Sequence, residues 1–164
     1  MIALPLEAGG VVPNMKKPAK FLQPGQLVVS DKPMQVTTIL GSCVAVCLFD
    51  HKLRIGGVNH FMLPLFSGNG ASSARFGDVA MRQLLEGMRA LGARIPLLEA
   101  RVFGGACMFP GMQSADHLGH KNAELALDFL YRAGIEVVQA DTGGDRGRKV
   151  IYQTDEGTAC LISI

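Results

Sequence analysis

The sequence predicts an α+β fold, a layered sandwich of mostly antiparallel β-sheet with two main helices on one face. Three observations lead to this prediction. A chain of 164 residues suits one domain with a sizeable core. Short β-prone segments bounded by turn residues recur along it, and two longer segments repeat apolar residues at helical spacing. The composition, 48% hydrophobic and 18% charged, is typical of a compact globular protein.

Residues 1–24 are expected to form a flexible N-terminal tail, because four of the eight prolines fall there without sustained periodicity. A single domain is therefore assigned to residues 25–164. Its β-segments are expected at 26–30, 35–40, 44–49, 55–63, 97–103, 135–140, 149–153 and 159–164.

Two helices are expected between these β-segments. The first begins at Asp78, a residue type that caps helix N-termini, and ends at Gly92. The second starts near Leu118 and stops at Gly134. Between 67 and 73 the sequence is rich in Gly, Ser and Asn, which favours a loop that could act as a surface flap.

Charge and cysteine content exclude several classes of protein. The net charge of +2 gives no reason to expect nucleic acid as a partner. Four cysteines without a CxxC spacing are expected to be reduced thiols. No signal peptide is recognisable, and no segment approaches the roughly 18 apolar residues of a membrane span, so we expect a cytoplasmic protein without membrane insertion.

The most informative pattern brings a thiol and an imidazole together on one hairpin. The β-prone runs 44–49 and 55–63 flank the polar connection 50–54, which predicts antiparallel pairing of residues whose numbers sum to about 103–105. Cys43 then lies opposite His60 or a near neighbour of it. Imidazole can accept a thiol proton, so the pair is a candidate nucleophile and base. If the two are coupled, Cys43 should be alkylated at neutral pH faster than an ordinary thiol.

Each of these residues also has a structural interpretation. Free cysteine is among the most buried residue types, and His60 has apolar neighbours on its own strand face. The preceding Gly41-Ser42 turn favours the catalytic interpretation, because it can expose backbone N–H groups near the sulfur. A hydroxyl or carbonyl from Thr37 or Thr38 could orient the imidazole, although threonine is common in strands for packing reasons alone.

Three other features are interpreted as structural. Cys47, about 13 Å along the strand from Cys43, is expected to pack in the core. His117 and His120 resemble half of a metal site, but a loop leading into a helix is the preferred interpretation. The segment 143–149 is not a P-loop; we interpret it as a basic turn, with docking of an acidic protein surface as the alternative.

Four motifs make the sequence resemble the CheD family of chemoreceptor glutamine deamidases. They are LGSCVAVC at 40–47, GVNHFMLP at 57–64, FGGA at 103–106 and DTGGDRGRK at 141–149. The resemblance runs from about Gly25 to the C-terminus. One departure is GHKN at 119–122, where the family often has Gly-x-Arg-Asn.

The resemblance implies a protein-glutamine glutaminase that hydrolyses glutamine side chains of methyl-accepting chemotaxis receptors to glutamate and ammonia. It implies Cys43, His60 and Thr37 as the catalytic residues, with Thr38 the adjacent alternative to Thr37. It also implies a fold similar to that of the deamidating cytotoxic necrotizing factor toxins and, in some members, binding of the phosphatase CheC. A thioester mechanism needs no metal or organic cofactor. Another cysteine acyl-transfer enzyme and a regulatory binding module that engages CheC are the alternatives.

Overall fold

The computed structural model describes residues 16–109, 111 and 117–164. Within this part of the chain, nine strands form two sheets, in the orders β10-β9-β4-β2 and β3-β6-β5-β7-β8. In chain order the helices and strands are β2 (Ala19–Phe21), β3 (Leu27–Ser30), β4 (Gln35–Leu40), β5 (Val44–Asp50), β6 (Ile55–Asn59), α1 (Gly77–Ala90), a 3-10 turn (Ile95–Leu97), β7 (Leu98–Gly104), α2 (Leu118–Ala133), β8 (Glu136–Thr142), β9 (Arg148–Gln153) and β10 (Ala159–Ser163).

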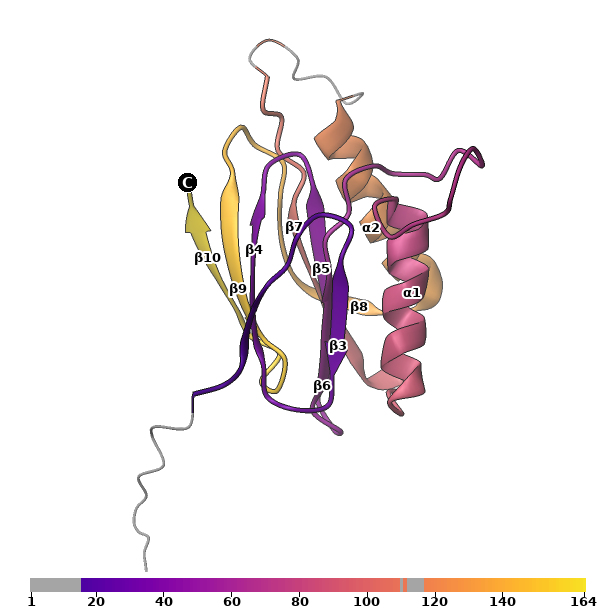
Figure 1. The fold of residues 1–164 in the computed structure, drawn as a ribbon, viewed down its shortest axis with the longest axis vertical. Helices are drawn as coiled ribbons and strands as arrows, with labels where there is room; N and C mark the ends of the chain where they lie inside the picture. Colours follow the sequence, from indigo (N-terminus) through magenta and orange to yellow (C-terminus); the bar gives the residue numbers. More distant parts are fainter. Residues whose placement is uncertain (1–15, 110, 112–116) are drawn as a thin grey trace, which may run out of the picture.

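The two sheets and the two helices form three layers (Figure 1). The five-stranded sheet lies in the middle, with the helices on one face and the four-stranded sheet on the other. Most neighbouring strands run antiparallel, while β2 with β4 and β7 with β8 are parallel pairs. The predicted α+β fold, with both helices on one face of a mostly antiparallel sheet, is confirmed.

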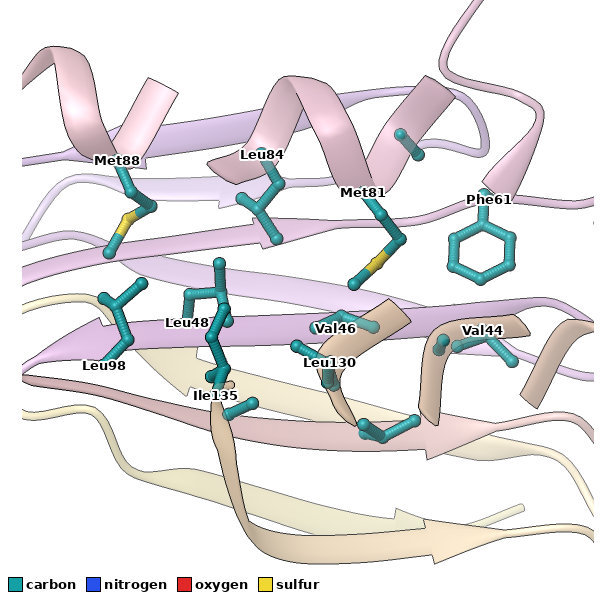
Figure 2. Packing of buried hydrophobic residues seen from close by; sticks show 14 of the residues in the cluster. Val44, Val46, Leu48, Phe61, Met81, Leu84, Met88, Leu98, Leu130 and Ile135 are labelled. Atoms are coloured by element: carbon teal, nitrogen blue, oxygen red, sulfur yellow. The ribbon is translucent and has the colours of Figure 1, made fainter. Parts of the chain in front are cut away.

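Strand β5 is buried along its whole length because both of its faces meet a core. Val44, Val46 and Leu48 point toward the helices, where Figure 2 shows them facing side chains of α1. Ala45 and Cys47 belong to the second core, between the two sheets. This double burial explains why the sequence of β5 is a continuous apolar run rather than an alternating pattern.

Both helices end close to the expected glycines, and α2 also begins where expected, whereas α1 begins differently. Helix α1 starts at Gly77, and its first turn has no side-chain cap; the Asp78 carboxylate instead accepts hydrogen bonds from the N–H groups of Phe66 and Val79. Helix α2 stops at Gly134, whose φ of 75° is the left-handed conformation that glycine adopts without strain. Neither described helix combines the length and apolar character needed to cross a membrane.

Part of the expected tail belongs to the folded domain. Residues 19–21 form β2 alongside β4, and the side chain of Leu22 is fully buried between the sheets. The ordered domain therefore begins before Ala19 rather than at Gly25. Three residues on a sheet edge are too few to produce a recognisable period, which is why the sequence pattern missed them. Residues 1–15 of the expected tail lie outside the described part.

Candidate active site

The register of the hairpin places Cys43 and His60 on one face. Strands β5 and β6 pair antiparallel, and beyond β6 the pairing resumes with a bridge between Val44 and Phe61, so paired residue numbers sum to 105. That sum lies within the predicted range. Cys43 stands opposite Met62, and His60 is its diagonal neighbour on the same face, where Cα atoms lie about 7–8 Å apart. Both side chains face the four-stranded sheet.

The two chains separate immediately beyond this bridge. Val44 and Phe61 exchange N–H to carbonyl hydrogen bonds of 3.1 and 2.9 Å, but the N–H groups of Met62 and Leu63 both turn to the carbonyl of Arg75. The separation occurs at the position of Cys43, whose side chain is only partly buried. A thiol at this end of the hairpin is therefore reachable from outside, whereas His60 behind it is 2% exposed.

Thr38 is the residue that holds the imidazole. Its Oγ1 lies 2.7 Å from His60 Nδ1 and 2.8 Å from the carbonyl oxygen of Leu22, and its side chain is buried. The hydroxyl has one proton, and the Leu22 carbonyl can only accept, so Thr38 donates to Leu22 and accepts from Nδ1–H. The contact thus selects the tautomer in which Nε2 carries the free electron pair.

Thr37, the residue implied by the family resemblance, occupies the other face of the same strand. In β4 the side chains of Thr37 and Thr38 alternate, and only Thr38 shares the inward face of Val36 and Leu40. The adjacent alternative, Thr38, therefore makes the contact with His60. The catalytic roles of Cys43 and His60 stay predictions that the geometry accommodates.

The electrostatics of the site favour an uncharged thiol and imidazole at rest. Burial lowers the pKa of His60 from 6.5 to about 4. Burial also raises the pKa of the Cys43 thiol, an effect that the residue's own backbone N–H opposes. Nε2 of His60 is buried without a hydrogen-bond partner among the described residues, as a base awaiting a proton would be. These directions are opposite to the lowered thiol pKa that would speed alkylation of Cys43 at neutral pH, and the alkylation rate stays a prediction.

The same burial predicts that the protein loses stability in acid. His60 binds a proton more readily in the unfolded chain, so the free energy of unfolding should fall as the pH drops from about 6.5 to about 4. The expected loss between pH 7 and pH 4 is about 3 kcal/mol. Urea unfolding at both pH values would measure it for the wild type, His60→Gln and, as an exposed control, His51→Gln. An equal acid loss in His60→Gln and the wild type would contradict the prediction.

Sequence reasoning assigned no role to two groups that complete the site. The first is the carbonyl of Leu22, which fixes the Thr38 hydroxyl. The second is Asn122 of α2, fully buried, whose amide donates to the carbonyls of Ser42 and Met62. Asn122 appeared in the sequence only within GHKN, a polar residue inside an amphipathic helix, and this was the one signal that could have pointed to it.

The residues interpreted as structural have structural surroundings. Cys47 is buried in the core between the sheets. His117 precedes α2 and its Nδ1 accepts the His120 N–H at 3.1 Å, which makes it a helix cap. In the basic segment, the Arg148 guanidinium forms an ion pair with Asp141 and donates hydrogen bonds to the carbonyls of Gly104 and Gly143. These contacts lie within the turn and the adjoining strands, which agrees with the structural interpretation.

A small pocket adjoins the turn that carries Cys43. It has a volume of about 200 Å³ and is lined by Ser42 together with Met108, Phe109 and Leu118 among others. The side chains of Met108 and Phe109 are 46% and 69% exposed. This rim is apolar, in contrast to the polar triplet of thiol, imidazole and hydroxyl behind it.

Together, fold and site define an α+β protein in which a buried threonine hydroxyl holds a buried histidine on the same face as a partly buried cysteine. The sequence model described as CheD chemotactic sensory transduction matches residues 62–162. The chain belongs to the CheD family.

Curated relatives cover most of the chain. A probable chemoreceptor glutamine deamidase CheD 1 of Anaeromyxobacter dehalogenans is 48% identical over 85% of this chain and 81% of its own length. A probable chemoreceptor glutamine deamidase CheD of Trichlorobacter lovleyi is 46% identical, covering 86% and 88%. A third, from Sulfurimonas denitrificans, is 38% identical, covering 90% and 95%. The similarity thus extends well beyond the motifs around the candidate site.

Proposed function

We propose that this chain is a protein-glutamine deamidase that converts glutamine side chains in the cytoplasmic helical region of methyl-accepting chemotaxis receptors to glutamate. The names of its relatives support the activity and the substrate class. The observation that carries the proposal is the hydrogen bond between Thr38 and His60 Nδ1, because it leaves Nε2 as a base on the face of Cys43.

In the first half of the reaction, the thiol attacks the glutamine side chain. His60 Nε2 takes the proton of Cys43 as the sulfur bonds to the amide carbon, and the carbonyl electron pair moves to oxygen. Backbone N–H groups near Cys43 stabilise that oxyanion. The tetrahedral intermediate collapses when the C–N bond breaks, and the imidazolium gives its proton to the departing ammonia. A γ-glutamyl thioester remains.

In the second half, water replaces ammonia. His60 removes a proton from water, the oxygen bonds to the thioester carbon, and the C–S bond breaks to release glutamate. The sulfur regains the proton from the imidazolium, which restores the resting pair. Every electron pair and proton is supplied by the enzyme, the amide and water, so no metal or organic cofactor takes part in this scheme.

The test uses the wild-type protein and a purified receptor cytoplasmic fragment. Each converted glutamine should become heavier by about 1 Da, with one ammonia released per conversion and the fragment uncleaved. A peptidase would shorten the fragment, and a transglutaminase would add a supplied amine in place of water. Either result, or an unchanged fragment that a CheD relative converts under the same conditions, would refute the proposal.

A further inference from the structure

Asn122 ties helix α2 to both chains of the hairpin at the point where they separate. Its Nδ2 donates to the carbonyl of Ser42 at 3.0 Å and to that of Met62 at 2.9 Å. Ser42 directly precedes Cys43, and Met62 stands opposite it. The side chain is fully buried, so water does not compete for these two bonds.

The amide replaces a hydrogen bond that the hairpin gives up. Continuing the ladder from Val44 and Phe61 would make Ser42 and Leu63 the next pair to exchange backbone bonds. The Leu63 N–H donates instead to Arg75, 3.1 Å away. Without Asn122, the Ser42 carbonyl would lose its partner just where the chains open around Cys43.

The start of α2 is packed closely enough for Asn122 to reach this position. A Cβ at Gly119 would collide with the carbonyl oxygen of Gly105, just beyond the end of β7. The Gly105 N–H in turn donates to the Cys43 carbonyl at 2.8 Å. The helix, the end of β7 and the turn at Cys43 therefore form one rigid contact, and Asn122 lies one helical turn beyond Gly119.

Fixing the Ser42 carbonyl also fixes the next N–H. In a planar trans peptide the carbonyl and the following N–H point in opposite directions. With the Ser42 carbonyl held toward α2, the Cys43 N–H points away from the helix. This N–H opposes the rise that burial causes in the pKa of the Cys43 thiol, which places it on the side of the sulfur.

We propose that Asn122 is a positioning residue, which orients the peptide between Ser42 and Cys43 so that the Cys43 N–H donates to the oxyanion formed when the sulfur attacks the glutamine amide. The proposal rests on the proposed function of Cys43 as nucleophile. Asn122 Oδ1 is buried without a partner among the described residues. An aliphatic side chain would avoid that unbonded oxygen, so the donating half of the amide explains why asparagine fits here.

The test separates a step that forms an oxyanion from one that does not. In Asn122→Ala, kcat for deamidation should fall about 10- to 100-fold with a smaller change in KM, because the donor is no longer aimed. Alkylation of Cys43 by iodoacetamide displaces iodide and forms no oxyanion. Its limiting rate at high pH, measured over a full pH profile, should stay within about threefold of the wild type.

Two further variants control for folding. Asn122→Ser keeps one donor and should recover part of the kcat. Leu130→Ala creates a cavity in the α2 core away from the site and lowers stability without touching Cys43, so the folded protein should keep its kcat. An equal loss of deamidation and of limiting alkylation rate in Asn122→Ala, or a kcat within threefold of the wild type, would overturn the proposal.

A measurement on the wild type removes any dependence on the folding of variants. A peptide with a side-chain aldehyde in place of the glutamine amide should add the Cys43 thiol to its carbonyl and give a hemithioacetal. The Cys43 amide proton should then move downfield in the NMR spectrum, while the Asn122 amide protons stay protected from exchange. An adduct without that shift would overturn the role of the Cys43 N–H, whereas absence of any adduct would refute Cys43 as the nucleophile.

Discussion

Replacing Cys43 by alanine is expected to lower receptor glutamine deamidation by about 10⁴-fold or more, since the proposed mechanism forms the thioester on this sulfur. The side chain is only partly buried and lies at the end of the hairpin, so its loss should leave the fold intact. Mass spectrometry of a receptor fragment, with circular dichroism of the enzyme alongside, measures both consequences.

A matched variant tests whether the effect belongs to this thiol. Cys160 lies on β10, is exposed, and is remote in the sequence from the hairpin, so Cys160→Ala should deamidate at the wild-type rate. Cys43→Ser keeps a hydroxyl nucleophile beside His60, so it tests more strictly whether the reaction needs the sulfur itself. Conversion by Cys43→Ala at the rate of Cys160→Ala would remove Cys43 from the reaction.

The pairing of the hairpin could be predicted because it is a local property. Two β-prone runs joined by the short polar segment 50–54 restrict the pairing sum to a few values, and the observed sum is 105. The C-terminal end of α2 could be predicted for the same reason, because Gly134 provides the left-handed residue that terminates the helix. In both places neighbouring residues alone determine the geometry.

The choice between the two threonines depended on pairing that the sequence does not encode locally. Strands β4 and β5 are consecutive in the chain, yet β4 pairs with β9 and β2 while β5 pairs with β6 and β7. Alternation places Thr37 and Thr38 on opposite faces, but only the packing of one sheet on the other decides which face meets His60. The contact of Asn122 with Ser42 could not be predicted either, because 80 residues separate the two in the sequence.

His60→Ala is expected to lower deamidation by about 10⁴-fold, because both proton transfers pass through Nε2. In the wild type, the pKa of about 4 keeps His60 unprotonated and able to act as a base across the neutral range. Deamidation measured as kcat/KM should therefore stay level as the pH falls from 7 to about 5 and decline only as it passes through about 4. A decline centred near 6.5 would mean that the imidazole is not desolvated in the working enzyme.

Replacing Thr38, whose hydroxyl holds His60, tests whether His60 acts as a base or only packs in the core. Thr38→Val removes the acceptor of Nδ1–H while keeping the shape of the side chain, so the tautomer is no longer fixed and the rate should fall about 10²-fold. Thr37→Val changes the opposite face of β4 and should lose less than about twofold. Rates for the two valine variants, compared at equal folded fraction, decide between them; a larger loss in Thr37→Val would assign the orienting role to Thr37 and refute the tautomer argument.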